Sequence, residues 1–279
     1  MRIPSDIRKA LHDIGQLADD DVDLAETALL LATIGRPAVQ LESYRRHLAT
    51  LCSDVSRYLS GLSRPPELTD CHEALVQILF RRYGYMGTEE SFNDQDAANL
   101  TYVIDRRSGL PVQLGLLYIH VARQQGWQAE GLSFPGRFLF RLEVNGERFI
   151  IDPYDGGAVV SPHDLRGLLK TISGAHAELL PDYYQAVSPR AVLLRIQNNI
   201  YNRLLRAGYI EEAVDVIRIM LLFAPKATDL WRECGLLYAR LDNIEQAIKA
   251  LETYLGFDTG GDSRYNASML LQELRQRLN

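Results

Sequence analysis

The sequence predicts a mixed α+β fold followed by an all-helical C-terminal region, and three observations carry that prediction. Helical apolar spacing gives way after Gly131 to alternation of apolar and polar residues, which is typical of a strand. Asn145-Gly146 interrupts the alternation, and type I′ hairpin turns favour this dipeptide. Nearer the C-terminus, similar positions recur at a spacing of 34 residues. We therefore expect a core domain at 1–185 and helical repeats at 186–279.

The apolar helix is expected to begin at Pro111 and to be enclosed on several sides. Proline suits the first helical position because its φ is already fixed and no needed N–H is lost. From Val112 to Ala122 apolar side chains fall on almost every face, which favours a buried helix over a surface helix. Gly126 is expected to end it.

The turn determines the register of the expected hairpin. A two-residue loop places Val144 opposite Glu147, Glu143 opposite Arg148, Arg141 opposite Ile150 and Leu139 opposite Asp152. One face of the hairpin is then apolar, and Glu143 faces an opposite charge. In this register Arg137 and Asp152 share the polar face on neighbouring strands.

Flanking segments complete the expected core domain. Helical spacing at 24–35, 41–59 and 69–83 predicts an N-terminal helical subdomain. Residues 84–99 are rich in Gly, Asn, Asp and Glu, so an exposed loop is expected there. Ser161 and Pro162 suit the start of another helix, and residues 181–189 are expected to link the two domains.

The parts of the core follow one another in the order found in the transglutaminase-like, papain-like fold: a helix, a strand with a basic residue, and a strand ending in Asp-Pro. More closely, GLPVQLGLLYIHVAR, FPGRFLFR and IIDPYDGG resemble segments of the bacterial SirB-type family, which couples a transglutaminase-like domain to tetratricopeptide repeats. The likeness runs roughly from Leu24 to the end of the chain. It implies a papain-like core with N-terminal helices, followed by an all-α repeat domain.

The resemblance implies a Cys-His-Asp triad, of which only Asp152 is present. In such a triad a helix N-terminus lowers the pKa of the thiol, histidine takes its proton and aspartate orients the histidine. Here Arg137 stands in the position of the histidine, and arginine stays protonated at any working pH. No Cys, Ser or Thr lies between Gly109 and Tyr118, where the nucleophile is expected. The remnant site expected from the resemblance comprises Arg137, Asp152, Pro111 and Gln113.

Two interpretations of Arg137 and Asp152 are open at this level. They form either a remnant site that now binds a ligand, or an ion pair on a half-exposed sheet face. An exposed pair of this kind contributes only about 0 to 1 kcal/mol. We expect a closed pair.

In the C-terminal region, Ala213 and Ala247 are 34 residues apart, as are Ile217 and Leu251. Trp231, Gly235 and Tyr238 match the tetratricopeptide pattern, whereas the first unit is degenerate, with Gln197 and Tyr201 in place of Trp and Gly. Residues 265–278 are expected to form a capping helix. The candidate protein-binding residues are Trp231, Tyr238 and Tyr201.

Composition argues against several classes of protein. A formal net charge of −6 disfavours direct nucleic-acid binding, because that affinity depends on neutralisation of phosphates by Lys and Arg. The apolar run at 25–32 is too short for a membrane span and lacks the layout of a signal peptide, so no membrane association and a cytoplasmic location are expected. Cys52, Cys71 and Cys234 are widely spaced, which indicates neither disulfides nor a zinc site. No metal or other cofactor is expected.

Two functions from different classes fit these observations. The first is a noncatalytic pseudoenzyme that acts as an interaction or regulatory protein and binds a protein or peptide partner through its repeats. The alternative is a cysteine-independent hydrolase, amidase or acyltransferase in the remnant cleft, with Ser108, Ser133, Tyr118 and Gln113 as nearby polar groups. An arginine can stabilise an oxyanion there but cannot act as a general base. The resemblance also implies a link to gene regulation, which would be indirect because no basic stripe or helix-turn-helix is visible. The sequence leaves the oligomeric state open.

Overall fold

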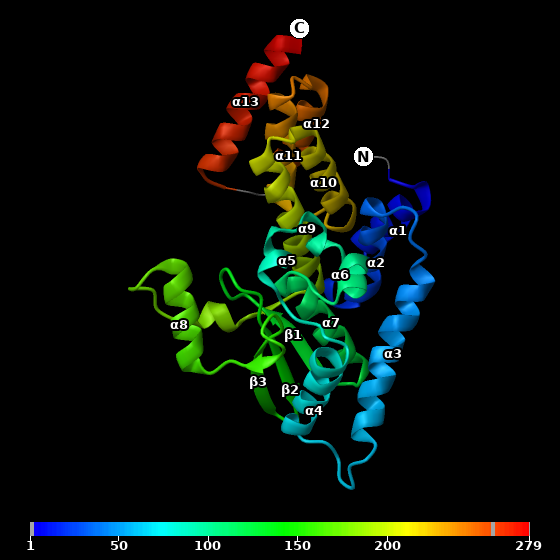
Figure 1. The fold of residues 1–279 in the computed structure, drawn as a ribbon. Helices are drawn as coiled ribbons and strands as arrows, with labels where there is room; N and C mark the ends of the chain where they lie inside the picture. The colour runs from blue at the N-terminus through cyan, green and yellow to red at the C-terminus, as the bar shows by residue number, and fades with distance from the viewer. Residues whose placement is uncertain (1–2, 258–259, 279) are drawn as a thin grey trace. The chain divides into compact units, whose positions relative to one another are not determined.

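The computed structural model describes residues 3–257 and 260–278, and the chain divides into two compact units (Figure 1). One unit is Ala18–Ile196, and the other combines Met1–Leu17 with Gln197–Asn279. The fold is mixed α+β, as predicted. The elements in chain order are α1 (Ser5–Gly15), η1 (Asp19–Asp21), α2 (Leu24–Gly35), α3 (Leu41–Leu59), α4 (Leu68–Leu75), η2 (Val76–Arg82), α5 (Glu89–Asn93), η3 (Gln95–Ala98), α6 (Leu100–Arg106), α7 (Pro111–Gln124), β1 (Gln128–Leu132), β2 (Phe140–Val144), β3 (Glu147–Asp152), β4 (Ala158–Val159), α8 (Pro162–Ser173), η4 (Pro181–Tyr184), β5 (Ala186–Val187), α9 (Pro189–Ala207), α10 (Ile210–Phe223), α11 (Thr228–Arg240), α12 (Ile244–Gly256) and α13 (Asp262–Leu278).

The unit of residues 18–196 is built on an antiparallel sheet with strand order β4-β3-β2-β1-β5. The β2–β3 hairpin has the predicted register, with Val144 opposite Glu147 and Glu143 opposite Arg148. Asn145 and Gly146 have φ values of 54° and 82°. A type I′ turn needs a positive φ at both central residues, so this turn accounts for the register.

Helix α7 packs on one face of the sheet, against β1 and β2, and α4 lies beside it against β2 and β3. It begins at Pro111, and Gly126 follows it with a φ of 80°, as the sequence predicts. A Cβ on Gly115 would lie 2.2 Å from Cε1 of Phe138, so only glycine allows this close contact between the helix and the segment that leads into β2. The helix is buried along nearly its whole length.

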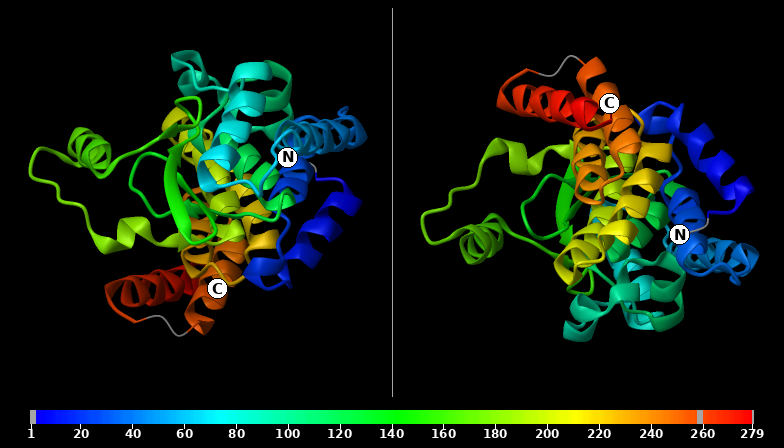
Figure 2. Two further views of the ribbon diagram at one scale, coloured as in Figure 1. Left: turned by 90° about the horizontal axis from the view of Figure 1, so that it is seen from below. Right: turned by 90° about the horizontal axis from the view of Figure 1, so that it is seen from above.

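Helix α8 covers the opposite face of the sheet through a second apolar cluster. Leu165 and Leu169 of α8 form this cluster with the buried Leu139, and the partly buried Ile150 of β3 packs against it. Figure 2 shows α8, in light green, on the side of the sheet away from the blue helix α3. The face that the sequence presents as polar and half-exposed is therefore partly enclosed.

Two expectations about connecting segments are wrong. Residues 84–99 are not an exposed loop, because Tyr85, Ala97 and Ala98 are buried and the segment contains α5 and η3. Its backbone meets the start of α7, where the Leu110 N–H donates to the Ala97 carbonyl at 3.3 Å. Residues 181–189 contain η4 and β5 rather than a bare linker, and β5 pairs with β1. The domain boundary at 185–186 stays a prediction.

The second unit contains the helical repeats. Consecutive helices from α10 to α13 pack in order along the chain. Ala213 and Ala247 are completely buried, and a Cβ on Gly235 would lie 2.7 Å from Cγ of Leu251, so small residues allow the helices to approach as predicted. Helix α13 packs on α12 through Leu271 and Leu274, in the place expected for the cap.

Helix α1, which the sequence analysis did not predict, packs on α10 within this unit. Ile7, Leu11 and Gly15 form its buried stripe. A Cβ on Gly15 would lie 2.3 Å from the Leu222 carbonyl oxygen, so the two helices touch backbone to backbone there. In the part of the chain that the structure describes, no helix has the length and apolar content needed to cross a bilayer.

Candidate functional site

The Arg137 guanidinium and the Asp152 carboxylate form a closed pair. Nε and Nη2 of Arg137 lie 2.8 and 2.7 Å from Oδ2 of Asp152. The other oxygen, Oδ1, accepts the backbone N–H of Tyr154 at 2.9 Å and that of Asp155 at 3.4 Å. Asp152 is 4% exposed, so the pair is enclosed rather than half-exposed as expected. Both carboxylate oxygens are engaged.

Arg137 does not lie on a strand, contrary to the expectation from alternation. Strand β2 begins at Phe140, and the Arg137 N–H instead donates to the Pro135 carbonyl at 2.8 Å around Gly136, whose φ is 70°. Because the Arg137 N–H is used in this three-residue turn, it is not available to extend the hydrogen-bond ladder of β2. The guanidinium then stacks on Tyr154, with Cζ 4.6 Å from the ring centroid. Sequence reasoning missed Tyr154, whose only signal was its position directly after Asp-Pro.

The pair is connected to helix α7 through its sequence neighbours. Phe138 and Pro153 both contact α7 at Gly115, close to the Pro111 end of the helix. The fourth predicted residue, Gln113, is used elsewhere: its amide Nε2 donates to the Ala98 carbonyl. Its Oε1 is buried without a hydrogen-bond partner among the described residues. No hydrogen bond joins Gln113 to Arg137 or Asp152 among the described residues.

The other polar candidates occupy separate places. The Ser108 hydroxyl lies 3.1 Å from that of Thr88, and the Ser133 N–H donates to the Gln185 carbonyl at 2.9 Å. The Tyr118 hydroxyl is buried without a hydrogen-bond partner among the described residues, and burial raises its pKa. The phenol therefore stays protonated at neutral pH.

The cysteines are not poised as nucleophiles. Cys52, Cys71 and Cys234 are free thiols, and burial raises the pKa of each to about 11. The reactive form of cysteine is the thiolate, so these thiols are protonated at neutral pH. Over residues 3–257 and 260–278, no group of three or more His, Cys, Asp or Glu side chains is placed to hold a metal ion.

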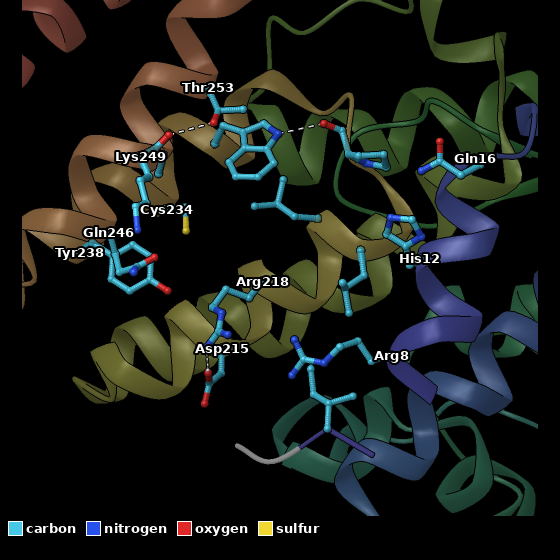
Figure 3. A pocket seen from close by; sticks show the side chains of 16 residues that line it. Arg8, His12, Gln16, Asp215, Arg218, Cys234, Tyr238, Gln246, Lys249 and Thr253 are labelled. Atoms are coloured by element: carbon cyan, nitrogen blue, oxygen red, sulfur yellow. Dashed lines mark hydrogen bonds and ion pairs between the residues drawn. The ribbon is translucent and has the colours of Figure 1, made fainter. Parts of the chain in front are cut away.

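A groove of about 860 Å³ lies in the unit that contains the repeats (Figure 3). Helices α10 and α12, the second helices of two successive units, form two of its walls, α11 contributes between them, and α1 supplies another wall. Its lining is Ile3, Arg8, His12, Gln16, Asp215, Arg218, Leu221, Leu222, Pro225, Trp231, Cys234, Tyr238, Gln246, Lys249, Ala250 and Thr253.

Two of the three predicted protein-binding residues line this groove. Trp231 and Tyr238 lie on α11, and the Trp231 indole N–H donates to the Pro225 carbonyl at 2.9 Å. Tyr201 is not part of the lining: it is 8% exposed, and its hydroxyl donates to Glu233 Oε1 at 2.6 Å. Sequence reasoning missed Arg8 and the rest of the α1 wall. The available signal was the spacing of four between Ile7 and Leu11.

Comparison with known proteins agrees with this architecture. Residues 42–198 match the transglutaminase-like superfamily, and residues 200–278 match the tetratricopeptide repeat. The chain thus combines a transglutaminase-like domain with C-terminal tetratricopeptide repeats. No solved structure matches the chain.

The chain belongs to the SirB-type UPF0162 family. A UPF0162 protein of Pseudomonas aeruginosa is 31% identical over 241 residues, which cover 85% of this chain and 84% of the relative. A UPF0162 protein of Vibrio cholerae is 30% identical over 243 residues, covering 86% and 88%. Protein SirB1 of Salmonella typhimurium is 24% identical over 184 residues, covering 66% and 68%.

Proposed function

We propose that this protein is a noncatalytic transglutaminase-like protein that acts as an interaction or regulatory module and holds a protein or peptide partner with its helical repeats. The groove over α11 is the observation that carries the proposal. Its lining combines buried or half-buried apolar side chains with exposed polar ones, which is the composition of a recognition site. Repeat arrays of this kind commonly present such surfaces to proteins.

The state of the remnant site supports the noncatalytic part of the proposal. The family resemblance places Arg137 where the base is expected, and a guanidinium cannot take a proton from a nucleophile. Asp152 is committed to Arg137 and to the Tyr154 N–H. A cysteine-independent hydrolase, amidase or acyltransferase would need another group to accept the proton, and the Tyr118 phenol is both buried and protonated. The three free thiols fit the cytoplasmic location that we also propose.

The proposal is tested on the full chain by blocking the groove. Gln246 is exposed on the α12 wall, and Gln246→Trp would fill the space beside it without disturbing the buried face. Glu252→Trp is the matched control, because Glu252 is an exposed residue of the same helix outside the lining. Tagged wild type and both variants are purified from native lysate, and co-purifying proteins are quantified by mass spectrometry. Partners should be lost with Gln246→Trp and kept with Glu252→Trp; identical sets for all three would contradict the proposal.

A further inference from the structure

We propose that the groove receives an acidic peptide segment with at least one large apolar side chain, and that Arg8, supplied by the N-terminal helix α1, binds a carboxylate of that segment. The inference rests on the proposed function, because it names the partner chemistry of the same groove. It adds a recognition residue that lies outside the repeats in sequence.

The charge of the lining points to an anionic partner. The lining contains three cationic side chains, those of Arg8, Arg218 and Lys249, and one carboxylate, that of Asp215. This local excess of positive charge contrasts with the formal net charge of −6 of the whole chain. Arg218 Nη1 lies 3.2 Å from Asp215 Oδ1, so those two charges partly compensate. Arg8 and Lys249, in contrast, have no side-chain ion pair or hydrogen bond among the residues that the structure describes. Two unpaired cations in one groove attract carboxylates.

The arrangement of these cations favours an extended segment over a single small anion. Figure 3 shows Arg8 reaching from α1 toward Arg218 and Asp215 of α10, while Lys249 lies on the other side of the groove beside Gln246 and Tyr238. The cations therefore bracket the groove instead of meeting at one point. An extended peptide carries carboxylates that can reach both sides.

The groove also has an apolar lining, which calls for an apolar side chain. The residues that contribute to it are Leu221, Leu222, Pro225, Trp231 and Ala250. The Trp231 N–H is already occupied by the Pro225 carbonyl, so this side chain offers the groove an apolar surface rather than a free donor. Inorganic phosphate or acetate would leave that surface uncovered. A peptide with acidic and large apolar residues would cover the apolar lining and pair with the cations.

Packing holds Arg8 at the groove. The buried stripe Ile7, Leu11 and Gly15 fixes α1 on α10, and the close approach of Gly15 to the Leu222 carbonyl sets their spacing. Arg8 directly follows the buried Ile7 in α1, so it lies beside the buried stripe on an exposed part of the helix. Its side chain therefore faces the groove edge instead of the core.

The test selects peptides without assuming a sequence. A phage-displayed library of random dodecapeptides is panned against the full-length protein, and enriched peptides are synthesised with a fluorescent label for anisotropy measurements. Peptides whose binding is lost with Gln246→Trp but kept with Glu252→Trp are assigned to the groove. We expect these peptides to carry net negative charge and at least one Leu, Ile, Phe or Trp, and to bind more weakly as salt increases.

Charge reversal then tests the residues. Arg8→Glu and Lys249→Glu should each weaken binding about tenfold or more, because each removes a charge-assisted contact and adds a repulsion. Arg206→Glu makes the same change of charge at an exposed position outside the lining and should leave affinity unchanged. A peptide with its critical acidic residue changed to lysine should regain affinity for Arg8→Glu. This rescue is an outcome that loss of α1 packing could not produce.

The outcomes separate the inference from the proposed function. Groove-dependent peptides that are neutral or basic, or acidic peptides indifferent to Arg8→Glu, would overturn the acidic partner while leaving peptide binding by the repeats intact. If no enriched peptide depends on the groove, both proposals fail.

Discussion

Arg137 holds Asp152 through two donors, Nε and Nη2, which both lie within 2.8 Å of a single carboxylate oxygen. The second oxygen of Asp152 binds the backbone of Tyr154, whose ring in turn stacks on the guanidinium. The resemblance to the transglutaminase-like family expects a histidine at the position of Arg137. Here the position instead pairs a guanidinium with a carboxylate.

Removing the guanidinium should therefore destabilise the protein. Arg137→Ala leaves a nearly buried carboxylate without its cation, and we expect a loss of about 1 to 3 kcal/mol in the free energy of unfolding. Arg141→Ala is the matched control. Arg141 has the same side-chain exposure of 23%, but its partner Glu130 is 41% exposed, so the expected loss is about 0 to 1 kcal/mol.

Thermal or denaturant unfolding of the two variants measures this difference. Equal losses would mean that burial of Asp152 does not increase the contribution of its ion pair to the free energy of unfolding.

The closed pair also predicts that small carboxylates and phosphate do not raise the melting temperature of wild type in a manner that depends on Arg137. Anion-dependent stabilisation that disappears in Arg137→Ala would show an open binding pocket instead.

Stability should fall as the pH falls from about 6.5 toward 4, with His47 contributing. Burial and the nearby Arg107 guanidinium lower the pKa of His47 from 6.5 to about 4. Between these pH values His47 is protonated in the unfolded chain but largely neutral in the folded chain, so a lower pH favours unfolding. His47 Nε2 lies 2.8 Å from the Tyr85 hydroxyl and 2.7 Å from Arg107 Nη1, which suits a neutral ring.

The contribution of His47 is isolated by substitution. His47→Gln removes the titrating group, so its melting temperature should drop less than that of wild type when the pH is lowered from about 7.5 to about 5. His176→Gln, at an exposed position, should follow the wild-type slope. A slope unchanged by His47→Gln would refute the assignment.

Thiol chemistry should be slow in the native protein. Because burial raises the pKa of all three cysteines to about 11, the thiolate fraction at neutral pH is very small. We expect a disulfide reagent such as DTNB to react rapidly only after unfolding. Replacing Cys52, Cys71 and Cys234 together by alanine should leave any measured activity intact. Rapid reaction of a thiol in the folded chain would contradict this prediction. Loss of activity in the triple variant without unfolding would indicate a cysteine-dependent enzyme.

The contact between α7 and the segment that leads into β2 should be intolerant of a single methyl group. In Gly115→Ala the new Cβ would lie 2.2 Å from Phe138 Cε1, and overpacking of this kind costs about 1 to 3 kcal/mol. Gly167 is the control: it lies within α8 with nothing within 4 Å of its Cβ position. Gly167→Ala should stabilise the helix by about 0.5 to 1 kcal/mol. Chemical denaturation of both variants should give shifts of opposite sign.

Features set by near neighbours in the chain could be predicted from the sequence. The start of α7 follows from the fixed φ of Pro111, and the hairpin register follows from Asn145-Gly146, where two positive φ values are needed. The close packing of the repeats follows from small residues at Ala213 and Ala247. Each depends on backbone geometry or on a spacing within one or two elements, which a sequence displays directly. The order of motifs was also enough to indicate the transglutaminase-like class and the repeats.

Features that join distant segments were decided by tertiary structure alone. Strand β5 has two residues, too few for a periodic pattern, and exists because β1 offers an edge to pair with. Asp152 is buried, its neighbour Pro153 packs on α7 and Arg137 binds its carboxylate, none of which alternation along the hairpin can show. Arg8 and Lys249 are far apart in the chain and line one groove because α1 and α12 pack in the same unit. Their positions depend on which apolar faces bury one another, and periodicity shows that a helix has such a face without showing which partner will cover it.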